Sequence, residues 1–256
     1  MVYRIKRWAQ RGLLGLELGG YRLVGLPRHD SFCPVCEKPV RHWRPLERMV
    51  GPGHFQSEGE GRLCPHCSSY ERTRHFWLHL QRTRFLYSRP RVLHFAPEAG
   101  LERQLRAALG GNLVTTDLEM PGVDVRSDIT RLPFRDSEFD LSYCSNVLEH
   151  IPDDRAAMRE LFRVLVAGGL AVIQVPIRGD TTYEDITIQS ADDRLKHFGQ
   201  ADHVRWYGRD IIKRLRDVGF EVTERYLLDE LGLTRADIVR FNVDKRELVY
   251  FCRKQA

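Results

Sequence analysis

Between residues 91 and 177, short apolar runs alternate with amphipathic stretches, and this alternation constrains the fold more than any other feature. Strands are predicted at RVLHF and NLVTTD, and a helix is predicted between them at LERQLRAAL, whose leucines share one face. The pattern returns in LSYCSN, in a helical stretch from Met158 to Leu165, and in LAVIQVPI after Gly168 and Gly169. Strands that alternate with helices predict an α/β fold, a largely parallel sheet with helices on both faces.

Two acidic side chains follow predicted strands where a ligand would lie, because open sheets of this kind bind ligands outside the carboxyl ends of their strands. Asp117 comes about 20 residues after the first turn, the spacing at which a carboxylate accepts hydrogen bonds from ribose hydroxyls. Asp128 would accept from an adenine amino group, with the Ile129 amide meeting a ring nitrogen. A lone aspartate can also simply cap a helix or turn, and this alternative stays open.

Four stretches carry a resemblance to the class I S-adenosylmethionine-dependent methyltransferases: DITRLPFRDSEFD, NVLEHIPDD, RVLVAGGL and HFGQADHVRWYG. Within that superfamily, the chain is similar to a bacterial group with an N-terminal Cys-rich segment and an H-x-A-P-E first loop. The resemblance covers about residues 31 to 225. It implies a Rossmann-like, seven-stranded, mostly parallel sheet with an antiparallel edge, S-adenosylmethionine as cofactor, and methyl transfer. It does not name the acceptor.

The first loop departs from the superfamily pattern D-x-G-x-G-x-G, since only its last glycine, Gly100, is present. Glycine lets backbone approach a ligand closely, and Pro97 removes an amide donor. Glu98 either receives the ammonium group of the cofactor or acts as a favourable acid at a helix start. Asn146 would border the site of transfer. The residues expected to bind the cofactor are His94, Ala96, Pro97, Glu98, Gly100, Asp117, Leu118, Asp128, Ile129 and Asn146.

Two C-x-x-C pairs, Cys33 with Cys36 and Cys64 with Cys67, are separated by 27 residues. Four thiolates in two such knuckles can close a tetrahedron around structural Zn²⁺. Disulfides are the alternative, but the chain reads as cytoplasmic, where thiols stay reduced. A thioredoxin-like redox pair would need a strand-to-helix context that this segment lacks. We therefore expect an N-terminal zinc-ribbon module.

The charge distribution separates the N-terminal part from the rest. The formal net charge is +5, and residues 1–90 hold 16 Lys and Arg against 7 Asp and Glu, or +9, which leaves −4 for the remainder. The predicted domains are a basic arm (1–30), a zinc-ribbon-like module (31–70), a connecting helix (71–89) and a methyltransferase domain (90–256).

The basic N-terminal part suggests two further partners. Arginines and lysines neutralise phosphates, so RNA methylation through the zinc module is an alternative function. The same arginines would also suit the solvent-exposed face of a helix that bridges two domains. The arm at 1–30 is too short and too charged for a transmembrane segment, but it suits peripheral contact with an anionic membrane. A poorly ordered arm, or one docked on its own protein, is the alternative.

Residues from about 178 to 207 lack a regular apolar period and form a long insertion, where a lid or an acceptor-binding surface is expected. The residues expected to bind the acceptor are Tyr183, His197, Gln200, Arg205 and Tyr207. The alternative is structural, with Asp202 and Arg205 as an internal ion pair and His197 as a helix cap.

Methyl transfer requires an aligned acceptor and, where needed, removal of its proton. His203 and His150 are candidate general bases, with Asp202 grouped beside them, because imidazole titrates near working pH. His150 could instead only fix its loop. The polar residues of the insertion predict a polar small-molecule or saccharide acceptor. The alternative that is not an enzyme is a non-catalytic zinc-containing binding or scaffold protein. It stays open because the first loop lacks two of the glycines found in cofactor-binding loops of the superfamily.

Overall fold

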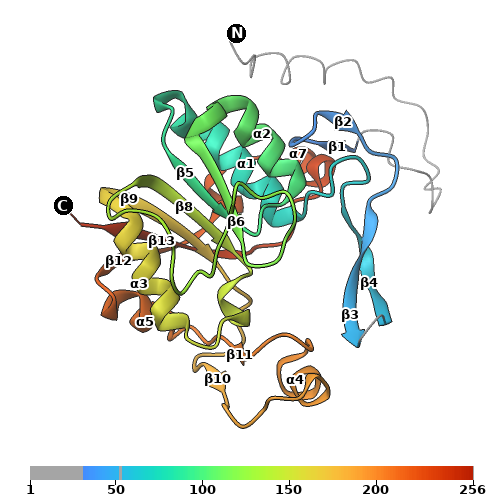
Figure 1. Ribbon diagram of the computed structural model, residues 1–256. Coiled ribbons are helices and arrows are strands. Elements are labelled where there is room, and N and C mark those ends of the chain that lie inside the picture. The colour runs from blue at the N-terminus through green and yellow to red at the C-terminus, as the bar shows by residue number, and fades with distance from the viewer. Residues whose placement is uncertain (1–30, 52–53, 256) are drawn as a thin grey trace, which may run out of the picture.

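The computed structural model describes residues 31–51 and 54–255 of the chain (Figure 1). The basic arm predicted at residues 1–30 lies outside the described residues. Among the described helices, none has both the length and the apolar character needed to cross a membrane.

The centre of the fold is a seven-stranded sheet in the order β12-β13-β9-β8-β5-β6-β7. The five strands from β9 to β7 run parallel, and β13 lies antiparallel between β9 and β12. The strand bounds are β5 (Val92–Phe95), β6 (Leu113–Asp117), β7 (Val125–Arg126), β8 (Phe139–Ser145), β9 (Leu165–Gln174), β12 (Phe220–Tyr226) and β13 (Leu248–Lys254). The predicted seven-stranded, mostly parallel α/β sheet with an antiparallel edge is confirmed.

Helices cover both faces of this sheet. One face packs against α3 (Asp154–Val164) and α5 (Ile211–Asp217), and the other packs against α1 (Glu71–Thr83) and α2 (Ala99–Leu109). Two short helices, α6 (Leu227–Glu230) and α7 (Arg235–Phe241), lie between β12 and β13 in the chain.

Alternate side chains along each central strand point into two different hydrophobic cores, one on each face of the sheet. In β8, Leu141 and Tyr143 face the core of α1 and α2, whereas Cys144 faces the core of α3. In β9, Val172 and Ile173 divide in the same way. Successive side chains of a strand point to opposite faces, so a strand covered on both sides is mostly apolar, with a few buried polar residues such as Ser142 of β8. This requirement explains the apolar runs of the sequence.

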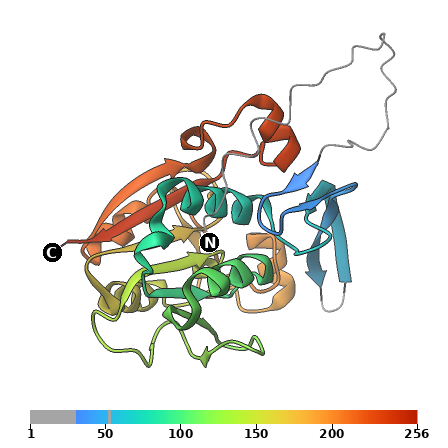
Figure 2. The same cartoon turned by 90° about the horizontal axis from the view of Figure 1, so that it is seen from above.

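The N-terminal segment contains two small hairpins, β1 (Phe32–Cys33) with β2 (Lys38–Pro39), and β3 (Arg44–Gly51) with β4 (His54–Leu63). Seen from above, these blue strands gather at the end of the molecule opposite the C-terminus (Figure 2). Cys33, Cys64 and Cys67 nevertheless belong to the same apolar core as Leu101 of α2 and Tyr143 of β8. The cysteine knuckles and the sheet therefore share one core.

The insertion between β9 and α5 contains a two-stranded pairing of β10 (Tyr183–Glu184) with β11 (Arg205–Trp206), and the helix α4 (Ala191–Phe198). We call residues 178–207 the lid. Its last part returns to the loop after β8, where the Val204 amide donates to the Glu149 carbonyl oxygen at 3.0 Å. Figure 1 shows the lid, mostly in orange, below the sheet.

Candidate functional site

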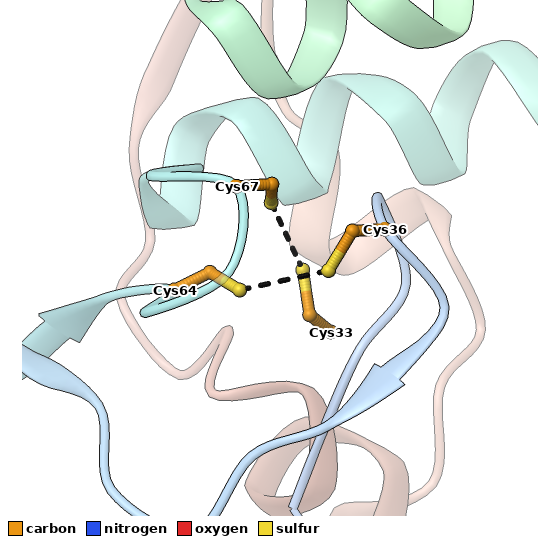
Figure 3. Close-up of side chains that lie close together, drawn as sticks. All are labelled: Cys33, Cys36, Cys64 and Cys67. Atoms are coloured by element: carbon orange, nitrogen blue, oxygen red, sulfur yellow. Dashed lines mark hydrogen bonds between the residues drawn. The ribbon is translucent and has the colours of Figure 1, made fainter.

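The four N-terminal cysteines converge from two turns (Figure 3). The Sγ atoms of Cys33 and Cys67 lie 3.7 Å apart, as do those of Cys36 and Cys64. A tetrahedron with Zn–S bonds of about 2.3 Å has edges of about 3.8 Å. Both sulfur separations match such an edge and are far from a disulfide bond of about 2.05 Å. The donor set and its spacing therefore fit a zinc ion.

The surroundings of the knuckles also suit a bound cation. Burial, together with the charges of Cys33 and Cys67, raises the pKa of Cys36 to about 12, and a cation bound among the four sulfurs would oppose this effect by stabilising the thiolates. Arg74 is fully buried nearby and donates to the Ser69 carbonyl oxygen at 2.7 Å, which in turn accepts from the Cys64 amide. The buried guanidinium thus stabilises the second knuckle, Cys64 to Cys67, through the Ser69 carbonyl oxygen.

The second knuckle abuts the predicted cofactor loop. A Cβ atom at Gly100, in the first turn of α2, would lie 2.8 Å from the Cys67 carbonyl oxygen and 3.1 Å from its sulfur. One residue before α2, Glu98 accepts from Arg72 of α1 at 3.0 Å. Glu98 is therefore the N-cap residue of α2 and forms an ion pair with Arg72. This ion pair was not predicted from the sequence. The knuckle, α1 and the loop form one continuous contact.

The first loop follows β5 directly. Ala96 adopts φ of 44°, the left-handed region that glycine occupies at low cost, and its position corresponds to a glycine of the superfamily pattern. The ring of His94 is fully buried beside Tyr143, with ring centroids 5.3 Å apart, and burial lowers the pKa of His94 to about 3. Pro97 is buried as well. The side chains of His94 and Pro97 thus point into the core, which leaves the backbone of this loop and the half-buried Glu98 as the groups that could meet a ligand.

The acids at the next strand ends partly stabilise their own turns. Asp117 ends β6, and its Oδ1 accepts from the amides of Glu119 and Met120, both at 2.8 Å. Asp128 accepts at Oδ1 from the amide and the hydroxyl of Thr130. The turn-capping alternative therefore holds for one oxygen of each carboxylate. Two large apolar side chains, Leu118 and Met120, are 55% and 37% exposed beside Asp117. Ile129 is buried.

The loop after β8 and the lid meet at a cluster of four polar side chains, Glu149, His150, Asp202 and His203. His150 Nδ1 lies 3.3 Å from Asp202 Oδ2, and the rings of His150 and His203 meet edge to face at 4.7 Å. His203 is 2% exposed. The fold thus brings together all three predicted catalytic residues. Asn146 begins the same loop with φ of 54° and its amide bonded to the Gln174 carbonyl oxygen.

Glu149 belongs to this cluster but was missed by the sequence reasoning, although it precedes His150 in NVLEHIPDD. Its side chain is buried, and neither carboxylate oxygen has a hydrogen-bond partner among the described residues. Burial raises the pKa of Glu149 to about 7. Ligand atoms of Glu149, His150 and His203 lie within 4.8 Å of one another.

Arg205 anchors the lid instead of facing a ligand. It is 3% exposed and donates to the carbonyl oxygens of Leu148, Ile151 and Pro152. It also donates to the Glu184 carboxylate at 2.8 Å. The ion-pair alternative was therefore right in kind, but its acid is Glu184 and not Asp202.

Tyr207 has a similar anchoring contact. Its hydroxyl donates to Asp154 at 2.7 Å, and Arg214 donates to the same carboxylate at 2.9 Å. Tyr207 is fully buried. Tyr207 thus connects the end of the lid to the first residue of α3, and Arg205 connects the lid to the loop that precedes α3.

The outer part of the lid contains a cavity of about 390 Å³. Its lining combines basic and aromatic side chains: Arg178, Tyr183, Lys196, His197 and Trp206. The Tyr183 hydroxyl and His197 Nδ1 are bonded at 2.8 Å, and Trp206 meets His203 edge to face at 5.8 Å. The cavity therefore lies one aromatic ring away from the histidine cluster. Gln200, also predicted to bind the acceptor, is half-buried beyond the end of α4.

Several arginine and aromatic side chains of the N-terminal part face the interior. Arg74, Phe76 and Trp77 of α1 are buried, and Phe76 stacks on Tyr143 with ring centroids 4.1 Å apart. Arg72 pairs with Glu98, as described above. This side of α1 joins the knuckles to the sheet, as the bridging-helix alternative expected, but Arg74 is buried and does not lie on the solvent-exposed face that this alternative predicted.

Residues 99–173, which run from α2 to β9, match a known protein family. That family is described as a methyltransferase domain. The methyltransferase-domain match includes the strand ends at Asp117, Asp128 and Asn146 and the cluster residues Glu149 and His150. It does not extend to the cysteine knuckles or to His94 and Ala96 of the first loop.

Curated relatives are similar over short stretches. The chain is 41% identical over 59 residues to an uncharacterized methyltransferase of Mycobacterium sp. (strain KMS), which is 23% of each chain. It is 34% identical over 104 residues to methyltransferase GfsG of Streptomyces halstedii, 35% of this chain and 37% of that protein. The chain thus spans about a quarter to two fifths of the length of these relatives.

Solved structures are similar over a larger share of the chain. A methyltransferase from Archaeoglobus fulgidus matches 69% of this chain and 91% of its own, with a TM-score of 0.47 and 15% identity. A methyltransferase from Mesorhizobium loti matches 66% and 96%, with a TM-score of 0.45 and 17% identity.

Proposed function

We propose that this chain transfers the methyl group of S-adenosylmethionine to a polar small-molecule or saccharide acceptor. The observation that carries the proposal is the methyltransferase-domain match at residues 99–173, whose strands end beside a polar cluster covered by the lid. In sheets of this kind, the ligand lies outside the carboxyl ends of the strands.

The cofactor residues are proposed in three parts. The free oxygen of Asp117 would accept from the ribose, while exposed Leu118 and Met120 offer apolar surface to the adenine. Asp128 and the Ile129 amide would contact the adenine edge. Backbone of the first loop would hold the methionine end, and Glu98 would share its carboxylate between Arg72 and the ammonium group. The bound cofactor supplies a sulfonium methyl group, and the chain supplies its alignment with the acceptor.

The acceptor is proposed to enter through the lid cavity. Arg178 and Lys196 offer positive charge and His197 offers a ring nitrogen, while Tyr183 and Trp206 offer flat apolar surfaces with polar edges. Such a lining suits a sugar ring or another polar molecule, including one that carries an anionic group. His150, Asp202 and His203 would hold the reacting oxygen and draw away its proton.

The four cysteines are proposed to hold structural zinc, which the sulfur separations support. Thiolate zinc sites suit a reducing compartment, so we propose that the protein is cytoplasmic. Zinc at this position would stabilise the contact between the second knuckle and the first loop.

The proposal is tested by calorimetric titration of zinc-replete protein with S-adenosylmethionine and S-adenosylhomocysteine. We expect micromolar binding, weakened at least tenfold in Asp117→Asn. Asp140→Asn is the matched control, because Asp140 is an exposed aspartate at the opposite end of the sheet, where it accepts from the Arg91 amide. Binding followed by methylation in a screen of glycosides and hydroxylated acids would support the proposal. Absence of binding to both compounds would reject it in favour of a scaffold.

A further inference from the structure

The buried carboxylate of Glu149 has no evident structural role. Its side chain is 1% exposed, yet both oxygens lack hydrogen-bond partners among the described residues. A buried polar group without a partner is costly, and a carboxylate more so, unless it is paired or coordinates a metal. Glu149 is therefore an unsatisfied acceptor that lies within the cluster described above.

Two imidazoles accompany this carboxylate. His150 is the next residue of the same 3-10 turn, Leu148–His150, and His203 comes from the lid. One ligand atom each of Glu149, His150 and His203 lies within 4.8 Å of the other two. The bond from the Val204 amide to the Glu149 carbonyl oxygen ties the two segments together. The cluster is thus built from two chain segments that are already fastened to each other.

Asp202 orients one of these imidazoles. Its carboxylate lies 3.3 Å from Nδ1 of His150, which leaves Nε2 as the other ring nitrogen. Histidines that bind metals usually donate their second ring N–H to a carboxylate or a carbonyl group, which fixes the tautomer and makes the ligating nitrogen more basic. The pair of His150 and Asp202 has this arrangement.

We propose that Glu149, His150 and His203 form a second metal site, distinct from the cysteine knuckles, that binds a divalent first-row cation such as Mn²⁺ or Fe²⁺. Two imidazole nitrogens and one carboxylate oxygen are the ligand set of the facial triad that leaves open coordination positions on such ions. The knuckles offer only thiolates, which select softer ions. The two sites therefore differ in ligand chemistry and in preferred metal.

The open positions point to the acceptor class, an inference that rests on the proposed function. A cation there would bind two neighbouring oxygens of the acceptor, as in a vicinal diol or a hydroxy acid, and would lower the pKa of the bound hydroxyl. The hydroxyl proton then leaves to water, the oxygen bonds to the methyl carbon, and the carbon–sulfur bond breaks to give S-adenosylhomocysteine. A cation held by Glu149, His150 and His203 would thus assist removal of the proton by making the bound hydroxyl more acidic, in place of direct proton abstraction by the imidazoles.

The site is tested with Mn²⁺ alone, without cofactor or acceptor, so that failure of the proposed function leaves the result readable. Zinc-replete protein is titrated with Mn²⁺, and the free ion is followed by its paramagnetic resonance signal. We expect one bound ion per chain, with zinc content unchanged. Glu149→Gln should weaken Mn²⁺ binding at least tenfold, and Asp202→Asn, which removes only the orienting carboxylate, should weaken it about 10- to 100-fold.

Two controls remove similar groups elsewhere. Glu221→Gln changes an exposed carboxylate of β12, and His197→Ala removes a lid histidine that is not part of the cluster; both should bind Mn²⁺ as the parent does. Circular dichroism checks that each variant is folded. The site would be refuted if zinc-replete protein bound no Mn²⁺, or if Glu149→Gln and Asp202→Asn bound it with unchanged affinity. In that case the cluster acts on the acceptor proton directly.

Discussion

Gly100 and Cys67 touch so closely that no side chain fits between them: a Cβ at Gly100 would lie 2.8 Å from the Cys67 carbonyl oxygen. The one glycine retained in the first loop therefore accommodates the second cysteine knuckle. This contact brings a proposed zinc ligand next to the helix that follows the proposed cofactor loop.

Gly100→Ala should therefore disturb both sites. The added methyl group must push α2 away from the second knuckle, and overpacking of this kind typically costs about 1–3 kcal/mol. We expect a lower unfolding temperature, weaker S-adenosylmethionine binding and easier loss of zinc. Gly111→Ala is the control, because nothing lies within 4 Å of a Cβ at Gly111. If both variants behave like the parent in calorimetry, the contact has no energetic importance.

Removal of zinc should lower cofactor affinity even though no cysteine is proposed to contact the cofactor. The four thiols, three of them buried, would separate without a metal, since their mutual positions depend on shared coordination. Movement of Cys67 would release Gly100 and the first loop. The expected result is at least a tenfold loss of S-adenosylmethionine affinity after chelation, reversed by added zinc. Equal affinity of the zinc-free and zinc-replete proteins would contradict this coupling.

Stability should fall in mild acid because of buried histidines. The folded-state pKa of His94 is lowered to about 3 from an ordinary value of 6.5, and that of His79 to about 4, both first by burial. Between these values and pH 6.5 the unfolded chain binds more protons, so the free energy of unfolding decreases as pH falls. Each group contributes at most about 1.4 kcal/mol per pH unit.

Substituting one of these histidines isolates its share. His94→Leu should flatten the dependence of unfolding free energy on pH between pH 6.5 and 4, as measured by urea denaturation, while His79 maintains part of the slope. An exposed histidine gives the comparison: His42→Leu should leave the slope unchanged. Parallel curves for the parent and His94→Leu would show that His94 does not titrate as its burial requires.

The lid should open when its arginine anchor is shortened. Lysine in place of Arg205 offers one ammonium group to the three carbonyl groups and the carboxylate that the guanidinium now reaches. We expect faster proteolysis within residues 178–207 and at least a tenfold loss of methyl transfer, with S-adenosylmethionine affinity retained. Arg209→Lys, at an exposed arginine, should change neither. Equal loss of cofactor binding in Arg205→Lys would mean that the lid supports the cofactor site as well.

The features that sequence could predict are those with a local signature. The apolar runs of β5, β8 and β9 indicated strands because their period and length are visible along the chain, and the paired C-x-x-C motifs indicated the cysteine cluster. The contacts of Gly100 with Cys67 and of Arg205 with Glu184 join segments 33 and 21 residues apart, and no local pattern records them. Glu149 could have been noticed, but its burial depends on the lid, which lacks a regular apolar period.

The shared core also limits which truncations and substitutions this protein can tolerate during evolution. Residues 64–83 cover the face of the sheet formed by Val92, Leu141 and Tyr143, so a shortened chain beginning at residue 91 would expose an apolar surface to water. Such a fragment should aggregate instead of folding. We therefore expect the cysteine segment and the sheet to evolve as one folding unit. A substitution on one side of their contact should limit the substitutions tolerated on the other side.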